Sequence, residues 1–116
     1  MHSSAARWCL ILGLAYVFAF FGIGKIIHPL LWIQWIPAWF EGALGMTRET
    51  WLTIFGWVEI LLAAALLIPK TKVQRIVAAL IAVHLVGVLS QTGLFNDIGI
   101  RDTGLFFMAL ALVFIL

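Results

Sequence analysis

Residues 55–69 read FGWVEILLAAALLIP, an almost continuous apolar run with one carboxylate, Glu59, near its middle. A charged side chain at the centre of a membrane-spanning helix costs about 2.5 to 3.5 kcal/mol on insertion scales. The run therefore raises two questions. The first is whether it crosses a bilayer, and the second is what offsets the cost of burying Glu59 there.

The composition of the whole chain answers the first question. Hydrophobic residues make up 65% of the 116 residues and charged residues 10%, and the mean hydropathy is +1.16. A soluble domain of this size has too little interior to bury so much apolar surface. The net charge of +2 comes from scattered Lys and Arg, with no basic run, so nucleic acid is not an expected partner. We expect an integral membrane protein.

Four apolar segments are separated by polar residues, and each is close to the length of about 20 residues that crosses about 30 Å of hydrocarbon. The segments predict spanning helices over residues 8–27, 51–68, 73–89 and 98–116. The second and third are joined by PKTKVQR (residues 69–75), a turn so short that they must form an antiparallel hairpin. The sequence thus predicts an all-α protein, a single domain over residues 1–116 that forms a four-helix transmembrane bundle.

The segment between the first two spans, HPLLWIQWIPAWFEGALGMTRE (residues 28–49), contains three tryptophans and two prolines. It is too short and too broken to span a bilayer, and indole rings favour the membrane–water interface. We expect this Trp-rich segment to lie in the interface, and the other aromatic side chains to form an aromatic belt and lipid contacts.

Charge asymmetry predicts the orientation. At one end of the bundle the cations have no acidic neighbours, and these are Arg7, Lys70, Lys72 and Arg75, whereas the other end mixes both signs. The positive-inside rule then places both termini and the turn over residues 69–75 in the cytoplasm. The Trp-rich segment would face outward.

Depth along the helices suggests a partner for Glu59. At 1.5 Å per residue, Glu59 lies about 12 Å below the outer boundary and His84 about 16 Å above the inner one, so the two reach similar depths. They stand on neighbouring antiparallel helices, and a carboxylate–imidazole contact would lower the cost of burying both groups. Gly56 and Ala63 flank Glu59 on one face, which allows close helix approach.

Three further ionisable groups lie nearer the outer ends of the other two spans. Lys25 follows a stripe of small residues on the first helix, and Arg101 and Asp102 occupy the first turn of the last. With Glu59 and His84 they could form one polar pocket that opens outward. In it, Glu59 and His84 are the candidate catalytic, proton-exchanging residues, and Lys25, Arg101 and Asp102 are the candidate ligand-binding residues.

Three motifs carry a family resemblance. They are FFGIGKIIHPLLW at the end of the first span, GWVEILLAAALLIP in the second, and NDIGIRDTGLFFMALAL at the start of the last. The chain resembles the DoxX family of small four-helix bacterial membrane proteins from about residue 10 to its end. The resemblance maps the family's Gly-Lys onto Gly24 and Lys25, its acid onto Glu59, and its Arg-Asp onto Arg101 and Asp102. It implies a bacterial inner-membrane protein linked to redox or sulfur-stress complexes.

Two classes of function stay open at this point. In the first, the chain is a redox-associated subunit whose pocket receives a quinone headgroup or a small anion. In the second, it is a structural or assembly subunit of a larger membrane complex, and the ionisable groups only hold helices together or reach the headgroups. No CxxC, HExxH or pair of core histidines occurs, so no metal or haem of its own is expected. The expected partners are lipid and other membrane subunits, and whether the chain is an enzyme is left open.

Overall fold

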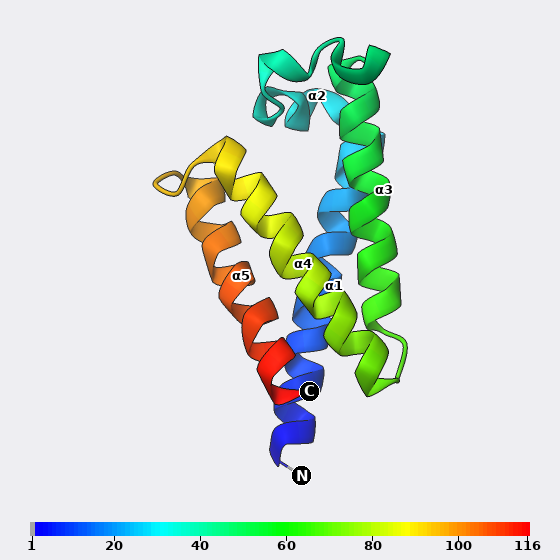
Figure 1. The fold of residues 1–116 in the computed structure, drawn as a ribbon, viewed down its shortest axis with the longest axis vertical. Coiled ribbons are helices and arrows are strands. Elements are labelled where there is room, and N and C mark those ends of the chain that lie inside the picture. The colour runs from blue at the N-terminus through cyan, green and yellow to red at the C-terminus, as the bar shows by residue number, and fades with distance from the viewer. Residues whose placement is uncertain (1) are drawn as a thin grey trace.

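The computed structural model describes residues 2–116, and within them the chain is helical with no strand. Four long helices dominate, namely α1 (His2–Ile27), α3 (Arg48–Leu66), α4 (Thr71–Thr92) and α5 (Asp97–Ile115). Each is long and apolar enough to cross a membrane. The chain is therefore a multi-pass, all-α membrane protein, and the predicted four-helix fold is confirmed (Figure 1).

Helix boundaries differ from the sequence prediction where polar residues cap the ends. The Thr47 hydroxyl accepts a hydrogen bond from the Thr50 main-chain N–H, so α3 begins at Arg48 and not at residue 51. The helix α4 runs beyond the predicted residue 89 to Thr92 and ends at Gly93, whose φ of 86° lies in the left-handed region that favours glycine. Thr47 was expected in a loop, but its side chain satisfies a main-chain N–H that the start of a helix leaves free.

The helices α1 and α3 make main-chain contact at two glycines. A Cβ atom added to Gly22 would lie 2.7 Å from the Gly56 carbonyl oxygen, and one added to Gly56 would lie 2.8 Å from that of Gly22. Any larger residue would force the helices apart, as expected for small residues at a transmembrane helix contact. The two helices run antiparallel, so the Cβ of Lys25 lies beside Gly56, 3.2 Å from a Cβ atom added there. From this position the Lys25 ammonium reaches Glu59, one turn further along α3.

The apolar core lies at one end of the bundle. Each long helix contributes side chains with no exposed surface, and these include Ile11, Leu14, Leu66, Ile81 and Leu112. Figure 1 shows that the start of α1, the end of α5 and the α3–α4 turn all lie at this end. Toward the other end the α4–α5 pair leans away from the α1–α3 pair. The bundle is thus tightly packed at one end and open at the other.

Residues 28–47, here called the cap segment, fold over the open end. Arg48, the first residue of α3, is hydrogen-bonded to this segment. Its Nη2 donates to the carbonyl oxygens of Ile33 at 2.9 Å and Ile36 at 3.0 Å. The Trp51 indole N–H donates to the Ala43 carbonyl at 3.1 Å. The cap segment consists of short helical turns, which are α2 (Pro29–Trp32), η1 (Ile33–Trp35), η2 (Ala38–Phe40) and η3 (Ala43–Gly45).

Candidate functional site

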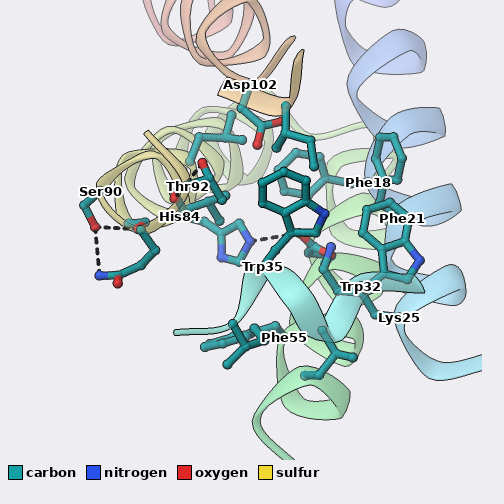
Figure 2. A pocket seen from close by; sticks show the side chains of 18 of the residues that line it. Phe18, Phe21, Lys25, Trp32, Trp35, Phe55, His84, Ser90, Thr92 and Asp102 are labelled. Atoms are coloured by element: carbon teal, nitrogen blue, oxygen red, sulfur yellow. Dashed lines mark hydrogen bonds and ion pairs between the residues drawn. The ribbon is translucent and has the colours of Figure 1, made fainter. Parts of the chain in front are cut away.

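A cavity of about 360 Å³ lies between the four long helices and the cap segment (Figure 2). All five ionisable residues that the sequence analysis selected line it, and they are Lys25, Glu59, His84, Arg101 and Asp102. One comes from α1, one from α3, one from α4 and two from α5. The five side chains therefore converge on one cavity, as expected. The expected outward opening needs correction, because cap-segment residues such as Trp35 and Ile36 line the cavity at that end of the bundle.

Glu59 connects three helices. Its Oε1 accepts a hydrogen bond from Lys25 Nζ at 2.6 Å, and its Oε2 lies 3.0 Å from His84 Nε2. The side chains of Lys25, Glu59 and His84 are 16%, 8% and 14% exposed. The predicted contact between Glu59 and His84 is therefore confirmed. Lys25 turns into the bundle, so it does not merely extend toward the headgroup layer.

With Glu59 ionised, as its ion pair with Lys25 favours, this contact selects one tautomer of the His84 ring. An ionised carboxylate can only accept hydrogen bonds, so the Nε2 that faces Glu59 must carry a proton. Neutral His84 then has its free lone pair on Nδ1, and that atom has no hydrogen-bond partner among the described side chains.

The two glycines around Lys25 serve different purposes. Gly22 makes the α1–α3 contact described above, whereas Gly24 makes room for an aromatic ring. A Cβ atom on Gly24 would lie 3.0 Å from Nε1 of Trp32, and the Trp32 ring centroid is 4.8 Å from Lys25 Nζ. Ring and ammonium attract each other through the ring quadrupole. The sequence GIGK thus positions the ammonium between Glu59 and a cap-segment indole.

Arg101 and Asp102 form a second charged pair. Arg101 Nε donates to Asp102 Oδ1 at 3.1 Å, and the guanidinium carbon lies 4.1 Å from the centroid of the Phe21 ring. The Asp102 side chain is 6% exposed and that of Arg101 36%. Arg101 is therefore the most accessible of the cavity's cations, and its outer N–H groups are available to a ligand.

The charges around the cavity balance when His84 is neutral. The cations Lys25 and Arg101 face the carboxylates Glu59 and Asp102, so the charges sum to zero when all four groups are ionised. A multiply charged anion would find no excess of positive charge here. A neutral headgroup fits this balance, and so does a single negative charge if His84 gains a proton.

The sequence analysis assigned the aromatic side chains to an interfacial belt and lipid contacts, and for part of them this prediction is wrong. Six of them line the cavity, and these are Phe18, Phe21, Trp32, Trp35, Phe40 and Phe55. The helical spacing of Phe18 and Phe21 from Lys25 is a signal that could have identified those two. No periodicity identifies the cap-segment rings, because their position depends on the cap segment folding back.

The fold and this site define the class of protein, a multi-pass four-helix membrane protein with ionisable side chains from four helices in one cavity. Residues 14–92 match the family described as Domain of unknown function (DUF8561), and the chain belongs to that family. The match includes Lys25, Glu59 and His84 and ends with the last residue of α4, so Arg101 and Asp102 lie beyond it. No curated protein and no solved structure matches the sequence.

Proposed function

We propose that this chain is a redox-associated membrane subunit whose cavity binds a quinone headgroup or a small anion. The observation that carries the proposal is the convergence of five ionisable side chains from four helices on a cavity whose other walls are mainly apolar and aromatic. A volume of about 360 Å³ falls within the range of small-molecule sites, which typically combine apolar walls with a few convergent polar groups. The resemblance to DoxX proteins supports the same proposal.

In this proposal the two groups of residues have different roles. Arg101, the more exposed cation, donates to the oxygen of the headgroup, and Lys25 adds a second donor from the opposite side. Asp102 orients Arg101. His84 exchanges a proton through Nδ1, and Glu59 stabilises the charged ring that results. Electrons would come from a partner subunit.

The alternative proposal is a structural or assembly subunit, and one observation favours it. Each of the five ionisable residues already has a partner within the cavity, as Lys25 and His84 do in Glu59 and Arg101 does in Asp102. Side chains that only hold helices together need nothing more. The two proposals differ in what happens when a charge is removed.

We further propose that the membrane is the bacterial inner membrane, with both termini in the cytoplasm and the cavity nearer the outer face. The support is the positive charge at the end of the bundle where the termini and the α3–α4 turn lie, at Arg7, Lys70, Lys72 and Arg75.

The substitution Arg101→Gln tests the binding proposal. Glutamine keeps a donor for Asp102 but loses the charge, so we expect a near-normal unfolding temperature. Headgroup affinity should fall by roughly 10- to 150-fold, since a charge-assisted hydrogen bond is worth about 1.5 to 3 kcal/mol. The probe is the ubiquinone headgroup without its tail, added to the purified protein in detergent. Quenching of the tryptophans at positions 32 and 35 reports binding, and formate, which carries a single negative charge, serves as the small-anion probe.

The charge-neutral pair Arg101→Gln with Asp102→Asn is the matched control. It removes the same cation without leaving a buried carboxylate, so it should bind as weakly as the single variant and fold at least as well. If neither probe binds the unaltered protein, or if both variants bind unchanged, the site proposal is wrong. A variant that loses only stability or partner subunits would favour the structural alternative.

A further inference from the structure

The cavity opens on one side of α4. Most of its lining is buried or half-buried, but three lining residues near the end of α4 are exposed, namely Gly87, Ser90 and Gln91. The cap segment closes the end of the bundle above them, since Trp35 and the buried Ile36 also line the cavity. The open side therefore faces sideways from the bundle axis.

This opening lies between α3 and α4. Figure 1 shows the two helices joined by the short turn after Leu66 and diverging from there toward the open end. In Figure 2, Phe55 of α3 and Ser90 of α4 stand on different sides of the cavity, and Trp35 of the cap segment lies beside His84. The opening is thus framed by two spanning helices and the cap segment.

The opening lies within the last turns of α4, a helix long and apolar enough to span a membrane. Gly87 precedes Thr92, the last residue of the helix, by five positions, which is about 8 Å at 1.5 Å per residue. Both framing helices are membrane spans by length and hydropathy. In a membrane that these helices cross, the opening would extend from the level of the helix end toward the hydrocarbon, where an apolar chain could occupy it.

We propose that the gap between α3 and α4 is a lateral entrance for a membrane-dissolved molecule with a flat polar headgroup and one long apolar tail. The headgroup lies inside, against Arg101 and His84, and the tail leaves past Gly87 into the bilayer. The inference rests on the proposed binding function and adds the ligand's class and its route. A headgroup held at the inner end explains why the cavity combines charged groups in its interior with an exposed, uncharged mouth.

Gly87 gives the entrance its width. Glycine within a helix costs about 0.5 to 1 kcal/mol relative to alanine. At Gly22 and Gly56 helix contact requires it, but a Cβ atom at Gly87 would meet nothing within 4 Å. Helix packing therefore leaves room for a larger residue at Gly87. In the proposed entrance, a larger side chain there would block the passage of the apolar tail. Gly104 on α5 is similarly open but does not line the cavity, so it provides a matched control.

The experiment compares Gly87→Leu with Gly104→Leu in the purified full chain. Two probes are titrated against tryptophan fluorescence, namely decylubiquinone and the same headgroup without its tail. We expect Gly87→Leu to weaken binding of the tailed probe about tenfold, or about 1.4 kcal/mol, and to leave the tail-less probe within about twofold. Gly104→Leu should change neither. Ser90→Phe, at the same mouth, should repeat the effect and guards against a folding defect in the first variant.

The outcomes separate the two proposals. Suppose that the tail-less probe binds, and that Gly87→Leu and Ser90→Phe weaken the binding of both probes equally or not at all. This result would contradict the proposed entrance but would leave headgroup binding supported. Failure of the unaltered protein to bind the tailed probe while it binds the tail-less one would do the same. Failure to bind either probe would overturn the proposed function, and the entrance with it.

Discussion

Glu59 can lie inside the membrane because it has two partners, and only one of them can be predicted by counting residues along the helices. Depth counting along antiparallel helices predicts His84, since the hairpin fixes which residues share a level. The contact with Lys25 is different, because it depends on the α1–α3 crossing at Gly22, and a stripe of small residues does not say which helix it meets. The aromatic side chains that the cap segment contributes to the cavity were not predicted for a related reason. The cap segment is held over the cavity by hydrogen bonds from Arg48 to main-chain carbonyl groups, and every residue has such a group, so the sequence does not reveal them.

The Glu59–His84 contact predicts non-additive stability. Glu59→Gln and His84→Ala should each lower the free energy of unfolding in detergent, and the double variant should cost less than the sum by about 0.6 to 2 kcal/mol, the range for interhelical hydrogen bonds in membranes. Denaturant titration of the four proteins measures the coupling. Strict additivity would mean that the two side chains do not interact in the folded protein.

At the scale of helices, α1 and α3 are positioned against each other by main-chain contact between Gly22 and Gly56. In lipid such contacts are stabilised by van der Waals packing and hydrogen bonds, since lipid tails are as apolar as the side chains.

The existence and approximate limits of the helices were predictable from hydropathy. Their exact ends were not, because caps such as Thr47 and Asn96 extend helices beyond the apolar run.

The glycine contact predicts a large effect from a small change. Gly22→Ala should destabilise the folded protein by about 1 to 3 kcal/mol, the usual cost of overpacking, because its methyl group would meet the Gly56 carbonyl and the Ile60 side chain. Gly104→Ala, where the added atom meets nothing within 4 Å, should be neutral or stabilising. Thermal unfolding in one detergent compares the pair, and equal stability of both variants would contradict the close contact.

At the scale of the whole molecule, the bundle has a closed end and an open end. The sequence predicts which segments share an end, because an even number of spans returns the chain to its starting side, and Figure 1 agrees with that arrangement. The divergence of the helix pairs was not predictable, since it arises from unequal packing among four helices that hydropathy describes in the same way.

The proposed orientation predicts an accessibility pattern. In a background where Cys9 is replaced by serine, a cysteine introduced at Ala43 should react with a membrane-impermeant maleimide in intact cells, and one introduced at Lys72 should react only after the membrane is permeabilised. The reason is the positive charge at the end that carries Lys72. The reverse pattern would place the cavity on the cytoplasmic side.

The bridge from Glu59 to two other helices has a consequence for biosynthesis. Lys25 precedes Glu59 by 34 positions and His84 follows it by 25, so the ribosome completes His84 about one to five seconds after Glu59 at usual elongation rates. During that interval Lys25 is the only member of the bridge that can neutralise the new carboxylate. Lys25→Ala should therefore lower the fraction of nascent chains whose second span inserts, more than His84→Ala does, in a glycosylation-mapping assay of translocon insertion. Equal insertion for the two variants would mean that the acid enters the bilayer without help from the first helix.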